Sequence, residues 1–272
     1  MNAPSDPTAY VDFAHGLADA ARAETLPRFR TDLRVDNKLD EAFDPVTDAD
    51  REAERAIRSQ IETRYPEHGI LGEEFGEVRG DARLRWVLDP VDGTRSFVCG
   101  VPTWTTLIAL EMEGEPMLGV IDQPYVGERW VGSREGTLLH RGGNIRKVAT
   151  SGRTALSDAR ISTTDPRAAA YFTESDAAAF ARVAGECKLA RFSMDAYAYA
   201  LLATGHLDLV VESGLQHYDY AALAPVVRGA GGVISNWDGG AFDAAKGGHL
   251  IAAATPELHA AARTLLGARD RP

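Results

Sequence analysis

The sequence predicts a layered α/β protein with helices first, a largely antiparallel sheet next, and a second half that alternates strands and helices. Two observations on the spacing of apolar residues predict this. Near the start, apolar residues recur every three to four positions, the spacing of one helix face. From Trp86 onward they form short runs separated by glycine-rich turns, which is typical of strands. With 272 residues, of which 44% are hydrophobic, the chain can bury a sizeable core.

Two helices are expected in the first half, over residues 7–26 and 47–65. Thr47 can cap the second helix, and Pro66 ends it because a residue that precedes proline avoids the helical conformation. Pro90 lacks an amide hydrogen and is expected to end the strand that starts at Trp86. Strands are expected at 86–88, 105–111, 117–121 and 129–132.

In the second half, predicted strands and helices alternate along the chain, which is typical of a sheet that helices cover on both faces. Gly205 marks one helix end, and Thr255-Pro256 supplies a cap followed by a proline that favours a helix start. We expect strands at 161–163, 189–192, 207–211, 232–235 and 250–254, and helices at 174–184, 195–204, 219–229 and from 255. The halves are expected to divide near residues 150–154, giving units 1–153 and 154–272.

Charge and composition exclude several classes of protein. Lys plus Arg is 29 and Asp plus Glu is 40, so the net charge is −11, which argues against binding to nucleic acid. A small phosphorylated substrate stays possible, because bound divalent cations reverse the local charge. Two cysteines are too few for a disulfide framework, and no apolar stretch approaches the ~20 residues of a membrane span. We expect a cytoplasmic enzyme or binding protein without a membrane partner.

Acidic residues follow three of the apolar runs. They lie in Gly72-Glu73-Glu74, in Asp89-Pro90-Val91-Asp92-Gly93-Thr94, and at Asp219. Asp89 and Asp92 stand three positions apart where a strand ends, and Gly93 permits a sharp turn, so the two carboxylates can converge. Converging carboxylates repel each other unless a cation lies between them, and oxygen ligands suit Mg²⁺ better than Zn²⁺.

Each segment also has an ordinary structural explanation. Asp-Pro and Asp-Gly are common turn formers, Glu73-Glu74 fits a solvated loop, and Asp219 fits a helix N-cap. Their occurrence in one chain, each after an apolar strand, favours a shared site, because sites form at the carboxyl ends of strands in α/β sheets.

The chain resembles the inositol monophosphatase family. The resemblance rests on 72–74, on Trp86 to Phe97 with its Asp-Pro-Val-Asp-Gly-Thr block, and on Asp219-Tyr220-Ala221-Ala222 with the glycines at 229–232. It implies a layered αβαβα fold, a homodimer, two or three Mg²⁺ ions per active site, and hydrolysis of a small phosphate ester. It also implies that the first unit carries most metal ligands, while the second supplies Asp219 and the substrate pocket.

The resemblance implies a ligand set for the metal ions. One Mg²⁺ would be held by Glu73, Asp89 and the main-chain carbonyl of Val91, and a second by Asp89, Asp92 and Asp219. Asp92 and Asp219 would also lie against the substrate.

Three further residues are implied beside the reacting water and the phosphate. Thr94 with Glu73 would orient the attacking water, and Glu73 can accept its proton. The amides of Gly93 and Thr94 can donate to phosphate oxygens. Asp50 matches a position near the water and a weaker third ion, although Thr47 and Asp50 also fit a helix capping box.

Departures from the inositol pattern indicate the substrate. Tyr218-Asp219 replaces Trp-Asp, and Ser193-Met194-Asp195 replaces Gly-Ser/Thr-Ala, so that Asp195 joins Glu212, which matches a substrate-contacting glutamate. Two carboxylates would suit a substrate with an ammonium or imidazolium group. Residues 97–110 and 122–130 also resemble the histidinol-phosphatase branch. Alternatively, Asp195 only caps the helix that reaches Thr204.

The leading hypothesis is a histidinol-phosphatase of histidine biosynthesis. An inositol-1-phosphate phosphatase and a 3'-phosphoadenosine 5'-phosphate phosphatase are the alternatives within the family. An alternative of another class is a family member that acts mainly as a binding partner of RNA polymerase. The complete set of acids favours catalysis over that role.

Overall fold

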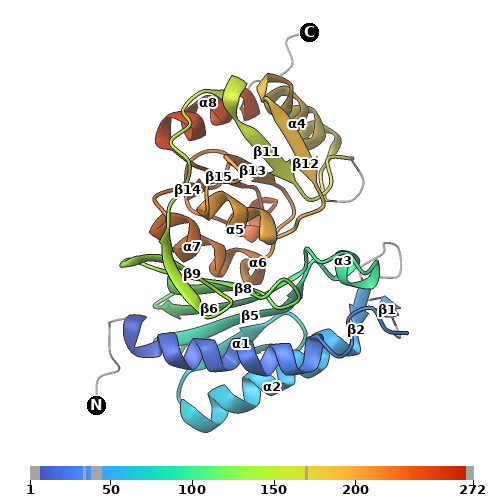
Figure 1. The fold of residues 1–272 in the computed structure, drawn as a ribbon, viewed down its shortest axis with the longest axis vertical. Coiled ribbons are helices and arrows are strands. Elements are labelled where there is room, and N and C mark those ends of the chain that lie inside the picture. The colour runs from blue at the N-terminus through green and yellow to red at the C-terminus, as the bar shows by residue number, and fades with distance from the viewer. Residues whose placement is uncertain (1–6, 33–34, 38–44, 169–170, 268–272) are drawn as a thin grey trace.

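The computed structural model describes residues 7–32, 35–37, 45–168 and 171–267. Helices and sheets alternate in the order αβαβα (Figure 1), as the resemblance implied. The first layer holds α1 (Val11–Thr25), which a 3₁₀ turn at Pro7–Tyr10 precedes, and α2 (Asp48–Arg64). Both predicted helices are thus confirmed, and Thr47 caps α2. Among the described residues, no helix is long and apolar enough to cross a membrane.

The second layer is an eight-stranded sheet of order β10-β9-β8-β7-β6-β5-β3-β4. Every neighbouring pair is antiparallel except β3 and β5. The strands are β3 (Gly69–Gly72), β4 (Gly76–Val78), β5 (Leu84–Asp92), β6 (Thr105–Met112), β7 (Glu115–Gln123), β8 (Glu128–Ser133), β9 (Gly136–Arg141) and β10 (Asn144–Val148). A short pair, β1 (Val35–Asn37) and β2 (Pro45–Thr47), lies apart from this sheet.

The expected end of the strand at Pro90 is wrong. β5 continues to Asp92 across a bulge, because Asp89 pairs with Leu107 and Asp92 with Thr105, which leaves one extra residue on β5. Proline is tolerated at a bulge because no ladder hydrogen bond is needed from its nitrogen. The Pro90 carbonyl accepts a hydrogen bond from the Thr106 hydroxyl instead, at 2.8 Å.

The third layer consists of the short helices α5 (Tyr197–Ala203), α6 (His217–Ala221) and α7 (Leu223–Gly229). The single helix expected over 219–229 is therefore two helices. Pro225 has no amide hydrogen to donate to the Ala221 carbonyl, so one continuous helical ladder cannot cross this point. Close packing on the sheet depends on Gly119, where an added Cβ would lie 2.1 Å from the Ala222 carbonyl oxygen.

A five-stranded sheet of order β12-β11-β13-β15-β14 forms the fourth layer. Its strands are β11 (Arg160–Thr163), β12 (Leu189–Phe192), β13 (Leu209–Glu212), β14 (Val233–Ser235) and β15 (Leu250–Ala253). β11 runs parallel to β12 and β13, and the other neighbouring pairs are antiparallel. The outer layer holds α4 (Glu174–Glu186) and α8 (Pro256–Leu266), which Thr255 caps.

The largest apolar core lies between the two sheets, around the third layer. It joins residues of the large sheet, such as Val87 and Leu107, to Val210 and Leu250 of the smaller one. The core therefore includes residues on both sides of the expected boundary, and the division into 1–153 and 154–272 stays a prediction.

Candidate active site

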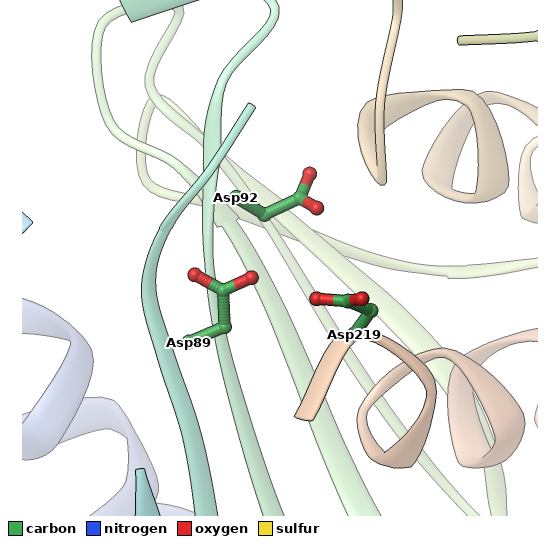
Figure 2. A group of neighbouring side chains, drawn as sticks. All are labelled: Asp89, Asp92 and Asp219. Atoms are coloured by element: carbon green, nitrogen blue, oxygen red, sulfur yellow. The ribbon is translucent and has the colours of Figure 1, made fainter. Parts of the chain in front are cut away.

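Three aspartates meet where the large sheet faces the middle helices. Asp89 and Asp92 come from the end of β5, and Asp219 from α6 (Figure 2). One carboxylate oxygen of each lies within 4.8 Å of the others. The segments that the sequence separates by more than a hundred residues are thus neighbours in space, as the shared-site hypothesis expected.

Backbone amides hold each of these carboxylates. The Val91 amide donates to Asp89 Oδ1 at 3.2 Å, and the Ala196 amide to Asp92 Oδ2 at 2.7 Å. Asp219 stands at the third position of α6, not at the N-cap, and accepts from the Gln216 amide at 2.7 Å. Its orientation comes from a capping box, in which the third-position side chain reaches back to the N-cap amide.

Burial and mutual repulsion both act on the carboxyl groups of this cluster. Burial raises the pKa of Asp89 well above its ordinary value, and the charges of Glu73, Asp92 and Asp219 raise it further. Burial also raises the pKa of Asp92, with contributions from Asp195 and Asp219. No lysine or arginine is among the main charges that act on either group. Converging carboxylate oxygens that repel one another fit a hard divalent cation such as Mg²⁺.

Glu73 extends this cluster from the end of β3. Its amide donates to the Leu88 carbonyl at 3.2 Å, which fixes the segment after β3 against β5. Its carboxyl group acts on Asp89 both by charge and as a hydrogen-bond partner. Glu73 therefore lies beside the aspartates, where the resemblance places it.

Asp50 takes part in a helix cap and also contacts Thr94. Its Oδ2 accepts hydrogen bonds from the Thr47 amide at 2.9 Å and the Thr47 hydroxyl at 2.6 Å. Its other oxygen lies 3.3 Å from the Thr94 hydroxyl. Burial, reinforced by the charge of Glu73, raises the pKa of Asp50 to about 6, although the bonds from Thr47 lower it. A place in the capping box and a place beside Thr94 are therefore compatible for Asp50.

Thr94 begins the short helix α3 (Thr94–Val98), directly after Gly93. Its hydroxyl lies 3.1 Å from the carbonyl oxygen of Val91, the backbone group expected to ligate a metal. Gly93 has a φ of +81°, and an added Cβ would lie 2.7 Å from Asp195 Oδ2. Glycine is required here both by the left-handed conformation and by the closeness of Asp195.

Asp195 does not cap the following helix. The N-cap of α5 is Ala196, with no side-chain cap, while the Asp195 carboxylate accepts a hydrogen bond from the Ser96 hydroxyl at 2.9 Å. Burial raises the pKa of Asp195, although Ser96 and the charge of Arg95 lower it. Ser193 and Asp195 have φ values of +61° and +48°, in the left-handed region that few residues other than glycine adopt.

Glu212 lies at the end of β13 and is almost fully buried. Its Oε1 accepts from the Thr164 amide at 2.8 Å and hydroxyl at 3.0 Å, and its Oε2 from the Thr163 hydroxyl at 3.0 Å. Burial raises the pKa of Glu212 to about 8; the charge of Asp195 also raises it, while the threonine bonds lower it. Asp195 is therefore close enough for its charge to affect Glu212.

Three residues that hold Asp195 and Glu212 in place were not predicted from the sequence. Ser96 fixes Asp195, and Thr163 and Thr164 fix Glu212. Thr163 ends a predicted strand and Thr164 follows it, so the rule that sites form at strand ends could have found both. His217 lies two residues before Asp219, and its Nε2 is 2.6 Å from Oε1 of the buried Glu111.

Comparison with known proteins agrees with the fold. The model of the inositol monophosphatase family matches residues 6–268. The chain is 45% identical over 196 residues to the bifunctional phosphatase IMPL2, chloroplastic, of Arabidopsis thaliana, covering 71% of this chain and 55% of that relative. It therefore spans about half of that relative's length. It is 38% identical over 237 residues to the histidinol-phosphatase of Streptomyces coelicolor, covering 83% and 86%.

Relatives with other names are also similar. An inositol-1-monophosphatase of Mesorhizobium japonicum is 35% identical, covering 70% of this chain and 71% of the relative. A Nus factor SuhB of Pseudomonas aeruginosa is 33% identical, covering 76% and 77%. Among solved structures, an inositol monophosphatase from Zymomonas mobilis superposes with a TM-score of 0.85 at 41% identity, covering 97% of this chain and 100% of that one. The chain belongs to the inositol monophosphatase family.

Proposed function

We propose that this protein hydrolyses L-histidinol phosphate to L-histidinol and phosphate with Mg²⁺ as cofactor. Membership of a metal-dependent phosphatase family supports the reaction class. The observation that carries the substrate assignment is the pair of acids at the site, Asp195 and Glu212, each with a raised pKa. Similarity to a histidinol-phosphatase supports the same assignment.

The ligands proposed for the metal ions are Glu73, Asp89, the Val91 carbonyl, Asp92 and Asp219. Bound divalent cations supply Lewis-acid stabilisation of the phosphate oxygens and of the departing alkoxide, and they lower the pKa of water. The convergence of Asp89, Asp92 and Asp219 supports this ligand set.

The remaining catalytic work is proposed for Glu73, Thr94 and Asp50. Glu73 accepts the proton of the attacking water, and the Thr94 hydroxyl orients that water. The contact between Thr94 and Asp50, at 3.3 Å, limits the directions in which the hydroxyl points. The amides of Gly93 and Thr94 donate to phosphate oxygens. Because α3 has only five residues, these amides act as individual donors.

The substrate's organic half is proposed to lie against Asp195 and Glu212. Burial disfavours the charged form of both acids, and the charge of Asp195 adds to this effect at Glu212. An ammonium or imidazolium group placed between them offsets that cost, since an opposite charge nearby favours ionised carboxyls. A neutral polyol supplies no such charge. Histidinol phosphate has both cationic groups.

Inositol-1-phosphate remains the second candidate substrate, because the solved structure from Zymomonas mobilis is that of an inositol monophosphatase. The assay is phosphate release from L-histidinol phosphate, inositol-1-phosphate and 3'-phosphoadenosine 5'-phosphate, each with Mg²⁺ and with EDTA. We expect the highest kcat/KM for histidinol phosphate and no turnover in EDTA. Equal or faster turnover of inositol-1-phosphate would refute the substrate assignment and leave the phosphatase assignment intact.

A homodimer is part of the proposal, as the family resemblance implies, and light scattering tests it. The RNA polymerase alternative predicts a different pair of results: polymerase recovered with the protein from cell extract, and no phosphate release in Mg²⁺. The cluster of acids supports catalysis instead.

A further inference from the structure

A buried carboxylate holds the turn that carries Glu73. Glu54 lies on α2, and its side chain is fully buried. Its Oε2 accepts a hydrogen bond from the Glu74 amide at 2.8 Å, and its Oε1 accepts one from the Phe75 amide at 3.2 Å. Both amides directly follow Glu73 in the turn that joins β3 to β4. A side chain from another layer of the molecule therefore fixes this turn.

Arg58 is a further partner of this carboxylate. Its Nε donates to Glu54 Oε1 at 2.7 Å, and its guanidinium also donates to the Gly76 carbonyl at the start of β4. A buried carboxylate costs free energy unless a counter-charge and hydrogen bonds compensate it, and Glu54 has both. Gly72, at the end of β3, leaves room for the carboxylate, because an added Cβ there would clash with Glu54 Oε1. The pair of side chains thus contacts both ends of the turn.

The outer side of this turn faces solvent. Phe75 and Gly76 are exposed, and Glu73 is partly buried. A segment with few buried contacts moves easily unless hydrogen bonds restrain it. The Glu73 amide donates to the Leu88 carbonyl of β5, and Glu54 restrains the two residues that follow. Together these bonds set the direction of the backbone from which the Glu73 side chain extends.

We propose that Glu54 is a positioning residue that directs the Glu73 carboxyl group toward Asp89. This rests on the proposed function, in which Glu73 is a metal ligand and accepts the proton of the attacking water. Glu54 acts through the backbone of the turn and touches neither metal nor substrate. Removal of a partner that orients a metal ligand weakens metal binding by about tenfold to hundredfold. Loss of Glu54 is therefore expected to weaken the binding of Mg²⁺.

The test is Glu54→Gln in the full chain. Glutamine keeps the length of the side chain but puts an NH₂ group in place of one carboxylate oxygen, and an NH₂ group cannot accept a hydrogen bond. Isothermal titration calorimetry on metal-free protein, without substrate, measures the Kd of Mg²⁺. We expect the Kd of at least one bound ion to rise about tenfold or more. Exchange of the Glu74 and Phe75 amide hydrogens should also become faster.

Arg58→Lys is the second variant, and it keeps the positive charge beside Glu54. A single ammonium group cannot span Glu54 and the Gly76 carbonyl as the planar guanidinium does. The Kd of Mg²⁺ should therefore rise in this variant too, by less than in Glu54→Gln. Because the net charge is unchanged, such a rise would show that the effect does not come from charge alone.

Asp208→Asn is the matched control for a loss of stability. Asp208 is also fully buried, and it accepts hydrogen bonds from the backbone amide and the guanidinium of Arg160, each at 2.8 Å. It directly precedes β13, at the opposite end of that strand from Glu212. Asp208→Asn should lower the Tm and leave the Kd of Mg²⁺ equal to that of the wild type.

Two results would overturn the proposal. An unchanged Kd of Mg²⁺ in Glu54→Gln, or in Arg58→Lys if Glu54→Gln does not fold, would show that the pair only stabilises the fold. An equal loss of Mg²⁺ affinity in Asp208→Asn would show that destabilisation alone causes the effect.

The proposed function is decided separately, on the wild type. Failure of the wild type to bind Mg²⁺ would refute the metal-dependent reaction and the role of Glu54 with it. Equally tight binding by the wild type and Glu54→Gln would refute the positioning role alone. The choice of substrate does not enter, because these binding measurements use no ester.

Discussion

Replacing Asp195 with asparagine removes one charge from the proposed substrate pocket while keeping the shape of the side chain. Shape matters here, because Asp195 Oδ2 would lie 2.7 Å from a Cβ at position 93 and accepts a hydrogen bond from Ser96. The amide oxygen of asparagine can still accept that bond. The variant therefore isolates the effect of charge.

The expected change in KM follows from the loss of one charged hydrogen-bond partner of the substrate. A hydrogen bond to a charged partner in a protein contributes about 1.5–3 kcal/mol, so its loss raises KM for a cationic substrate roughly tenfold to hundredfold. Glu212 remains and still attracts the substrate, so binding is weakened and not abolished. For a neutral ester such as inositol-1-phosphate, Asp195→Asn should leave KM within about twofold, because no ion pair is lost.

Steady-state phosphate release from both esters measures this difference. Asp243→Asn is the control, because Asp243 pairs with Lys246 at the surface, caps a 3₁₀ turn, and can be replaced by asparagine in that cap. Its kinetics should match the wild type. An equal rise in KM for the cationic and the neutral ester would refute the charge argument, since it would show that Asp195 only shapes the pocket.

Three other variants test the site and the fold. Asp92→Asn should reduce turnover to below about 1% of wild type with an unchanged circular dichroism spectrum, because it removes a proposed metal ligand; substantial residual activity would contradict that role. Asp208→Asn should destabilise the protein by about 2 kcal/mol at pH 7, because Asp208 is buried and accepts bonds from Arg160. Gly119→Ala should lower the Tm, because its Cβ would lie 2.1 Å from the Ala222 carbonyl oxygen; an unchanged Tm would refute this close packing.

The effect at Asp208 depends on pH in a definite direction. Burial by itself would raise the pKa of Asp208, but hydrogen bonds from Arg160 and Ser151 lower it below the ordinary value. A lowered folded-state pKa stabilises the protein above the unfolded-state pKa of about 4, and this stability is lost as the pH falls through the folded-state pKa. The free energies of unfolding of the wild type and Asp208→Asn should therefore differ at pH 7, and the difference should shrink as the pH falls below the unfolded-state pKa. A constant difference across that range would contradict the linkage.

The helix and strand predictions that the structure confirms depend on patterns of a few neighbouring residues. The α2 cap depends on Thr47 and Asp50, three residues apart, and the start of α8 on Thr255 and Pro256. Strand β12 has the expected bounds, 189–192. By contrast, β9 and β10 were not predicted. For β10 the reason is that four of its five residues are exposed and show no apolar alternation.

The sequence by itself determined the kinds of ligand at the site, and only the tertiary structure decided which of them meet. The oxygens of Asp89 and Asp92 share one bulged strand end, so their convergence is a local property of the chain. Asp219 reaches them because the middle helices pack between two sheets, and Asp195 faces Ser96 for the same reason. Such contacts depend on packing free energy summed over distant segments, and no local sequence pattern encodes that sum.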